Sequence, residues 1–308
     1  MEIQGISGQV QVDVNKQKSF RLAGLAQAGL WLLLTLGGTA GHAEPAKTPK
    51  AGAPPYTLMV APRQSRIVLQ RQWSPFAQAL SRELGREVQL VIPVSFGEFE
   101  SLLAQGRADL AYMDPYQAVV HHRRPGYRPL LRDGSKKLVG ILVVRDDHPA
   151  RRLADLPRPA RIGFPDPNAF GASLYIRAVL NEREKLHYLP RYLGTHANVI
   201  RHVLHGQVDA GGSVAHTLER EPPEVRARLR VLYQTPPFAT HPLSAHPRLS
   251  ASERRAIINA VRRLSRQLLT DVDMREPVIA SYERDYRPLE ALRLERYYDH
   301  RGLERRRP

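Results

Sequence analysis

The feature that most limits the folds open to this chain is a short passage that occurs twice. Residues 105–111 read Gln-Gly-Arg-Ala-Asp-Leu-Ala, and residues 205–211 read His-Gly-Gln-Val-Asp-Ala-Gly. Each passage reads as the end of a helix, a glycine in a left-handed turn, and an aspartate where the chain enters a strand. Because the passage closes two successive strand–helix–strand units, it predicts two similar lobes.

Strands and helices alternate around both passages. Short apolar or β-branched runs predict strands over residues 56–60, 88–94, 110–113, 138–144, 162–164, 188–193 and 229–233. Helices are expected to begin near Ser74, Asp114, Asn168, Thr195 and Ser250, which are good capping residues or precede a first-turn proline. This alternation is typical of βαβ units and predicts an α/β fold with largely parallel sheets.

The order of the elements divides the chain after its leader into three parts. Residues 56–143 form the first part of lobe one, residues 144–235 form lobe two, and residues 236–308 return to lobe one. Two crossings between two lobes make a hinge, so a ligand cleft is expected between the lobes.

The first 43 residues have the three-part pattern of an export signal. Lys16, Lys18 and Arg21 precede an apolar run over residues 22–36, and small residues at 41 and 43 permit cleavage before Glu44. The apolar run is short and ends in glycines, which argues against a permanent membrane span. Residues 44–55 are rich in Pro, Ala and Lys and are expected to form a flexible tether. We therefore expect a periplasmic protein.

Composition narrows the classes of ligand. The net charge is +16, which is compatible with nucleic acid, an anionic membrane surface or a small anion. No basic stripe is interleaved with aromatic residues, so nucleic-acid binding is not expected. The 12 histidines show no metal-site spacing, and the chain has no cysteine, P-loop or nucleophile elbow. We expect neither a cofactor nor a metal nor catalysis.

The turn after the strand over residues 162–164 has the properties of an anion site. Two prolines end the strand, and Asn168 is expected to cap a helix over residues 169–181. The first amides of a helix lack intrahelical partners, and the dipole there is positive. An ordinary strand-to-helix turn has the same features. The candidate ligand residues of this turn are Asn168, Ala169, Phe170 and Gly171.

Other candidates lie near the ends of strands. Tyr112 and Tyr116 follow the strand over residues 110–113, and open sheets bind ligands at the carboxyl ends of their strands; Tyr112 reads equally well as a core aromatic residue. The run Gly211-Gly212-Ser213 predicts a second amide-rich turn, with Gly212 and Ser213 as ligand residues. Arg63 or Ser65 would close the cleft from lobe one.

Together these motifs resemble the phosphate/phosphite/phosphonate substrate-binding family of ABC transporters. The resemblance covers residues 56–298 and rests on residues 72–76, 108–112, 166–168 and 194–198, followed by Val208-Asp209. It implies an exported type 2 periplasmic binding protein, in which two lobes with mainly parallel sheets flanked by helices close on an oxyanion.

The resemblance also assigns individual residues. The anion-holding turn of the family falls on Asn168 to Ser173, where Ala169-Phe170-Gly171 replaces a Ser-Thr-Ser-Gly-like run of hydroxyl residues. The family's histidine falls on His196 and its acidic strand-entry residue on Asp209. Without the resemblance, His196 reads as a capping or surface residue. Asp209 reads as a structural residue like its twin, Asp109. A tyrosine of the other lobe has its counterpart in Tyr112, Tyr116 or Phe96.

The function that the resemblance implies is transport. The protein would be a monomer that binds phosphonate, phosphite or phosphate and delivers it to an ABC permease in the inner membrane, without chemistry. The altered turn leaves another small anion open, including an organic phosphate or a sulfonate. The alternative is a periplasmic sensory subunit that presents a small anion to a membrane signalling partner. A third possibility, an exported enzyme on the same fold, is not expected, because the sequence offers no set of residues suited to catalysis.

Overall fold

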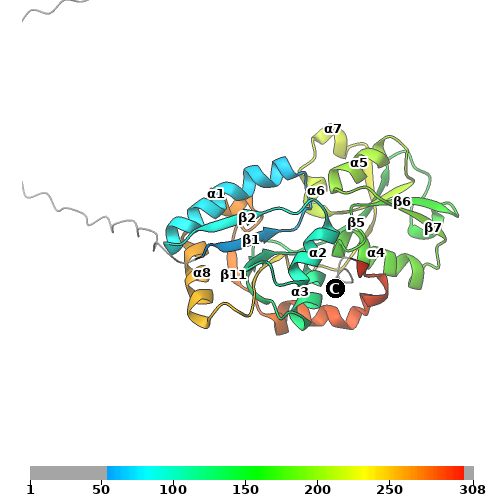
Figure 1. Cartoon of the computed structure of the whole chain (residues 1–308). Coiled ribbons are helices and arrows are strands. Elements are labelled where there is room, and N and C mark those ends of the chain that lie inside the picture. The colour runs from blue at the N-terminus through cyan, green and yellow to red at the C-terminus, as the bar shows by residue number, and fades with distance from the viewer. Residues whose placement is uncertain (1–53, 302–308) are drawn as a thin grey trace, which may run out of the picture. The chain divides into compact units, whose positions relative to one another are not determined.

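We analysed a computed structural model, which describes residues 54–301 of the chain. The predicted export signal and most of the predicted tether lie outside the described residues. Across residues 54–301, no helix has both the length and the apolar character needed to cross a membrane. The described residues form two β-sheets with helices packed around them (Figure 1).

The first sheet, with its helices, is called lobe 1. Its six strands lie in the order β11-β4-β10-β3-β1-β2. The strands are β1 (Tyr56–Val60), β2 (Val88–Val91), β3 (Leu110–Tyr112), β4 (Arg128–Asp133), β10 (Pro242–Ala245) and β11 (Pro277–Ile279). The helices are α1 (Arg66–Leu84), α2 (Phe96–Ala104), α3 (Pro115–Arg123), α8 (Ala251–Arg263) and α9 (Arg266–Asp271).

The second sheet, with its helices, is called lobe 2. Its five strands lie in the order β7-β6-β8-β5-β9. The strands are β5 (Gly140–Arg145), β6 (Ala160–Phe164), β7 (Tyr188–Tyr192), β8 (Ala210–Val214) and β9 (Leu229–Gln234). The helical segments are η1 (Leu153–Asp155), η2 (Phe170–Leu174), α4 (Tyr175–Ala178), η3 (Val179–Arg183), α5 (His196–Leu204), α6 (Ala215–Glu219) and α7 (Pro223–Arg226).

The two-lobe α/β fold expected from the sequence is confirmed, and its sheets are mixed. β1 pairs in parallel with β2 and β3, and β6 pairs in parallel with β7 and β8. The strands next to the crossings, β10 and β5, are antiparallel to their neighbours. β10 re-enters its sheet from the hinge, at the end where β3 leaves it, and therefore runs in the opposite direction.

The chain passes between the lobes twice, before β5 and before β10. The two crossing segments pair with each other, because Leu138 and Phe238 exchange two backbone hydrogen bonds of 2.9 Å. β5 pairs with β8 and β9 and so belongs wholly to lobe 2. The boundary expected at 143/144 cuts this strand; the crossing lies before Gly140. The run over residues 138–144 is apolar without a break, so the sequence contains no signal for the point at which the chain passes from one lobe to the other.

The repeated passage has the same structural role in both lobes. The Oδ2 atom of Asp109 accepts a hydrogen bond of 2.8 Å from the amide of Thr57, the second residue of β1. The Oδ2 atom of Asp209 accepts one of 2.7 Å from the amide of Arg161, the second residue of β6. Each carboxylate also pairs with an arginine side chain at 2.6 Å. Both aspartates therefore fasten two parallel strands together at the end remote from their carboxyl termini.

Helix α1 begins earlier than its sequence predicts. It starts at Arg66, where Ser65 caps it by accepting a hydrogen bond from the amide of Val68, and Pro75 lies inside the helix. Leu69 and Trp73 extend the buried stripe of Phe76 and Leu80 toward the N-terminus. The serine–proline pair at residues 74 and 75 is therefore not a helix start, because burial of the preceding turn outweighs the missing proline amide.

The two lobes share part of their core. One apolar cluster contains Phe99 and Tyr116 from lobe 1 together with Phe170, Leu174 and Val214 from lobe 2. All five side chains are at least nine-tenths buried. The contact between the lobes therefore includes tightly packed apolar side chains as well as the two crossings.

The C-terminal segment contacts both lobes, whereas the sequence predicted contact with lobe one alone. Its short helices are η4 (Tyr282–Tyr286), η5 (Arg287–Leu292) and η6 (Leu294–Tyr297), the orange-to-red part of Figure 1. In lobe 1, the hydroxyl of Tyr298 donates to Glu100. In lobe 2, the side chain of Asn168 exchanges hydrogen bonds of 3.0 and 2.7 Å with the backbone of Asp299.

Candidate functional site

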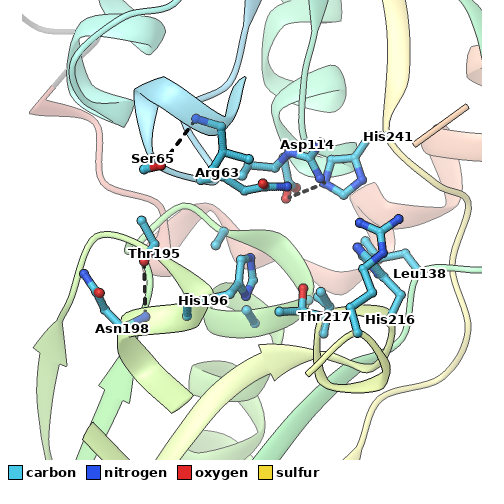
Figure 2. Close-up of a pocket in the computed structure, with 18 of the residues that line it drawn as sticks. Arg63, Ser65, Asp114, Leu138, Thr195, His196, Asn198, His216, Thr217 and His241 are labelled. Carbon is cyan, nitrogen blue, oxygen red and sulfur yellow. Dashed lines mark hydrogen bonds and ion pairs between the residues drawn. The ribbon is translucent and has the colours of Figure 1, made fainter. Parts of the chain in front are cut away.

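A cavity of about 510 Å³ lies between the lobes (Figure 2). Lobe 1 contributes the start of α1, the start of α2 and the residue before α3; lobe 2 contributes the turn after β6 and the starts of α5 and α6. The volume falls within the range of small-molecule sites, roughly 300–1,000 Å³. The cavity lies at the carboxyl ends of β3 and β6, where open α/β sheets bind ligands.

Arg63 is the strongest sign of an anion in this cavity. The residue is only 9% exposed, and its Nε has no partner among residues 54–301. Its guanidinium makes one long hydrogen bond, 3.5 Å from Nη1 to Nε2 of His241, and Nη2 lies 4.0 Å from a carboxylate oxygen of Asp273. A buried charge with such weak partners is costly, and a ligand anion would offset that cost.

The ring of Tyr112 packs against the guanidinium of Arg63 in a cation–π contact. The Cζ atom of Arg63 lies 5.1 Å from the centre of the Tyr112 ring. The ring packs against Trp73, with centroids 4.8 Å apart, and against His241, with centroids 5.8 Å apart. Tyr112 does not line the main cavity and is 1% exposed. Its place in the structure is that of a positioning residue for the guanidinium.

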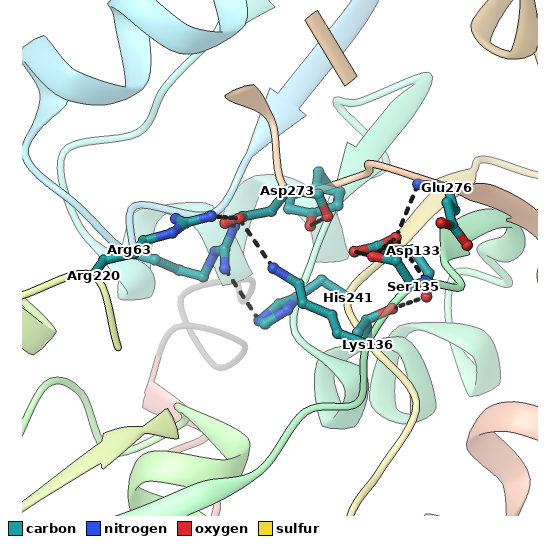
Figure 3. Close-up of polar contacts among 10 residues, drawn as sticks. Arg63, Asp133, Ser135, Lys136, Arg220, His241, Asp273 and Glu276 are labelled. Atoms are coloured by element: carbon teal, nitrogen blue, oxygen red, sulfur yellow. Dashed lines mark hydrogen bonds and ion pairs between the residues drawn. The ribbon is translucent and has the colours of Figure 1, made fainter. Parts of the chain in front are cut away.

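Asp273 contacts three positively charged side chains (Figure 3). One of its oxygens lies 2.5 Å from Nη2 of Arg220, a residue of lobe 2, and 3.3 Å from Nζ of Lys136. Burial alone would raise the pKa of Asp273, but Arg63, Lys136 and Arg220 outweigh it and hold that pKa well below its ordinary value. Asp273 is therefore ionised at neutral pH, and it links the lobes.

The first turn of α5 forms the wall on the side of lobe 2. Thr195 caps the helix by accepting a hydrogen bond of 3.2 Å from the amide of Asn198, and the helix starts at His196 and Ala197 (Figure 2). Nδ1 of His196 lies 3.3 Å from Oγ of Ser213. Burial lowers the pKa of His196 to about 3, so the ring is neutral. Ser213 can donate to Nδ1, an arrangement that leaves the ring proton on Nε2.

The turn after β6 differs from its expected form. The helix begins at Phe170, its cap residue is Ala169, and Asn168 instead binds the C-terminal segment. The amide of Phe170 donates a hydrogen bond of 3.1 Å to Oδ2 of Asp114, in lobe 1. A protein carboxylate therefore already occupies the helix start at which a ligand anion was expected.

Asp114 lines the cavity, although the sequence indicated only its role at the start of a helix. It is 5% exposed, and its Oδ1 accepts a hydrogen bond of 3.1 Å from the amide of Tyr116 at the start of α3. Its Oδ2 lies 3.7 Å from Nε2 of His241. Burial raises the pKa of Asp114 to about 7, despite the two amides that favour its ionised form.

The predicted second amide-rich turn is a strand. Gly212 and Ser213 lie in β8, opposite Leu142 and Ile141 of β5. A Cβ atom on Gly212 would lie 2.0 Å from the carbonyl oxygen of Ala172, so glycine is required here for η2 to approach the sheet. Ser213 reaches the site only through His196.

The structure thus divides the predicted ligand residues into two groups. The group that lines the cavity is Arg63, Ser65, Ala169, Phe170, Gly171 and His196. The group that does not is Tyr112, Tyr116, Asn168, Asp209, Gly212 and Ser213. Tyr116 is fully buried and stacks on Phe170 with centroids 6.2 Å apart, whereas Asp209 is committed to Arg161.

Six further charged or titratable residues line the cavity and were not predicted as ligand residues: Asp114, Arg201, His216, Arg220, Glu221 and His241. Asp114 could have been found from its place between a strand and a proline-initiated helix, and Arg201 from its place on the same helix as His196. No sequence motif surrounds the other four: His216 lies on the short helix α6, Arg220 and Glu221 follow that helix, and His241 lies at the end of a crossing.

Two mixed sheets joined by two crossings, with a cavity between them, define the class of two-lobe solute-binding proteins. Residues 58–286 match the family model of the phosphonate periplasmic substrate-binding proteins of ABC transporters, and the chain belongs to that family. The family is one of periplasmic substrate-binding proteins, not of enzymes.

Solved structures share this fold. PhnD1 from Prochlorococcus marinus, in complex with methylphosphonate, is 16% identical with a TM-score of 0.67, over 77% of this chain and 96% of that one. A binding-protein component of an ABC phosphonate transporter from Pseudomonas aeruginosa is 19% identical with a TM-score of 0.66, over 79% and 87%. XAC2383 from Xanthomonas citri, bound to ATP, is 15% identical with a TM-score of 0.65, over 79% and 99%.

Proposed function

We propose that this protein binds a phosphonate-like oxyanion in the cavity between its lobes and delivers it, as a monomer, to an ABC permease in the inner membrane. The observation that carries the proposal is Arg63, a buried guanidinium at the cavity whose Nε has no partner among residues 54–301 and whose nearest carboxylate oxygen lies 4.0 Å away. Membership of the family and the complex of the related PhnD1 with methylphosphonate support the choice of anion.

The anion would contact both lobes at once. Arg63 supplies the charge from lobe 1, and the first amides of α5 with the neutral ring of His196 supply hydrogen-bond donors from lobe 2. A ligand held by both lobes stabilises the closed arrangement over an open one, because only the closed arrangement offers all of these contacts. The site therefore uses α5, and not the turn after β6, as its anion-binding helix start.

The histidines of the cavity are neutral near pH 7. Burial lowers the pKa of His196 to about 3 and that of His216 to about 4, and it also holds the pKa of His241 well below its ordinary value. Near neutral pH the positive charge at the ligand therefore comes from the arginines.

Titration calorimetry with methylphosphonate, phosphite, phosphate and methanesulfonate tests the proposal. The variant Arg63→Gln should weaken binding at least about 30-fold, because removal of one partner of a buried charge pair costs upwards of about 2 kcal/mol. The matched control is Arg255→Gln, which removes an exposed charge on α8 and should leave binding unchanged. No heat with any of the anions, or full affinity in the Arg63 variant, would contradict the proposal.

A further inference from the structure

We infer that the physiological ligand carries, beside its acid group, an apolar arm of several carbon atoms that packs on one wall of the cavity. This inference rests on the proposed function and adds the part of the ligand that the acid group does not specify. It follows from the size of the cavity, from the chemistry of that wall and from the state of the carboxylate beside it.

The cavity is too large for a simple oxyanion. Its volume of about 510 Å³ corresponds to about 17 water molecules at about 30 Å³ each. Methylphosphonate has about five non-hydrogen atoms, each no larger than a water molecule, and would leave more than half of the space to solvent. A ligand that fills the cavity must therefore extend well beyond its acid group.

The wall next to this space is apolar and continuous. It consists of the cavity-lining side chains that belong to the apolar cluster shared by the two lobes, and we call it the apolar wall: Phe96, Leu138, Ala169, Phe170, Ala172 and Val214. Phe96 and Val214 keep 7% and 5% exposure. Water against such a wall gains few hydrogen bonds, and its displacement by carbon atoms is favourable.

The polar group beside the apolar wall does not call for a cationic arm. Both oxygens of Asp114 already accept backbone hydrogen bonds of 3.1 Å, from Tyr116 and from Phe170. Each oxygen keeps a second lone pair, and Glu221 is a further acceptor on the lining, but an ammonium group would also face the guanidinium groups of Arg201 and Arg220 there. A hydrocarbon arm does not meet that repulsion.

Calorimetry with methyl-, ethyl-, propyl- and butylphosphonate tests the inference on the wild-type chain. Affinity should rise roughly fourfold per added methylene, which corresponds to about 0.8 kcal/mol for each buried CH₂ group. The heat-capacity change of binding should become more negative along the series, because more apolar surface is buried. A 4-aminobutylphosphonate should bind more weakly than butylphosphonate.

The variant Val214→Phe, which fills the space beside the apolar wall, should remove the gain from longer arms. If this variant does not fold, Val214→Thr is the alternative, because it keeps the shape of the side chain and adds a hydroxyl group. It should reduce the gain in affinity per added methylene by at least about half. Val231→Thr on β9, which does not line the cavity, is the matched control.

The outcomes separate the two proposals. If no phosphonate of the series binds, the proposed function itself is wrong. If methylphosphonate binds as tightly as butylphosphonate, or if the aminobutyl compound binds more tightly than the butyl compound, the proposed function stands and the apolar arm is overturned.

Discussion

The carboxylate of Asp114, in lobe 1, accepts a hydrogen bond of 3.1 Å from the backbone amide of Phe170, in lobe 2. The bond joins the cap of α3 to the first amide of η2 across the space between the lobes. The first amide of η2 therefore has a hydrogen-bond acceptor within the protein. The bond also places a titratable carboxyl group at the edge of a cavity whose lining includes three arginines.

The affinity for anions should therefore depend on pH through Asp114. Burial raises the pKa of this group to about 7. Below that pH the carboxyl group is neutral and does not oppose an anion; above it the carboxylate repels one, so wild-type affinity should fall as pH rises through 7. Asp114→Asn should bind methanesulfonate about as tightly as the wild type at pH 5.5 and up to about tenfold more tightly at pH 8.5.

Methanesulfonate is the appropriate probe because its charge does not change in this range, and calorimetry at the two pH values gives the ratio directly. The matched control is Asp271→Asn, a carboxylate on α9 that does not line the cavity. A ratio between Asp114→Asn and wild type that stays constant with pH would show that Asp114 does not act on the ligand through its charge.

Short sequence patterns were sufficient to predict the two similar strand–helix–strand units. The helix–glycine–aspartate passages predicted two similar units, and Asp109 and Asp209 indeed make equivalent bonds to Thr57 and Arg161. These bonds involve groups at fixed places within one βαβ unit, so the sequence pattern and the structure coincide. The same reasoning shows why Asp209 lies away from the cavity, since the strand ends it joins are opposite to the ends that face the ligand.

Contacts between the lobes were beyond the reach of sequence patterns. Nothing near Asp114 indicates that its partner lies at Phe170, because the pairing depends on how two separately built sheets meet. Asn168 has the sequence of a helix cap, yet Asp299 competes for its side chain. Partners so distant in the chain follow from tertiary packing, and local propensity gives way to it.

Tyr112 should act on the ligand through its ring and not through its hydroxyl. The ring lies beneath the Arg63 guanidinium at 5.1 Å, whereas the hydroxyl makes only a long hydrogen bond of 3.4 Å to the backbone of Asp273. Tyr112→Phe should keep the affinity for methylphosphonate within about twofold. Tyr112→Leu should weaken it by roughly three- to tenfold, as expected for a lost cation–π contact.

Calorimetry on these two variants, with urea unfolding to verify that both fold, decides between two roles. The family resemblance implies that a tyrosine of this lobe contacts the ligand. If the hydroxyl of Tyr112 made that contact, Tyr112→Phe would lower the affinity for methylphosphonate more than Tyr112→Leu. That result would contradict the positioning role.

Asp273 should stabilise the ligand-free protein by compensating the arginines of the cavity. Asp273→Asn leaves Arg63 buried without its nearest carboxylate, so the free energy of unfolding should fall by about 3 kcal/mol. Asparagine tolerates the left-handed backbone at this residue, where φ is 60°, so the change tests charge and not backbone strain. A ligand anion should raise the free energy of unfolding more in the variant than in the wild type.

Lys136→Gln is the control for this prediction. Lys136 contacts the same carboxylate at 3.3 Å but is 30% exposed, so its removal should cost less than about 1 kcal/mol. Unfolding in urea with and without methylphosphonate gives both quantities. Equal ligand-induced stabilisation of wild type and Asp273→Asn would mean that the bound anion does not replace the missing charge.

The last prediction concerns whether Asn168 stabilises the fold or binds the ligand. Its side chain exchanges two hydrogen bonds with the backbone of Asp299 and is absent from the cavity lining, although the family resemblance places it in the anion-holding turn. Asn168→Ala should lower the free energy of unfolding by about 1–3 kcal/mol, because two half-buried backbone groups of Asp299 lose their partners. The same variant should bind methylphosphonate within about twofold of wild type, since Arg63 and α5 are untouched. Urea unfolding and calorimetry on one preparation measure both effects. A large loss of affinity without a loss of stability would indicate that the anion binds at the turn after β6.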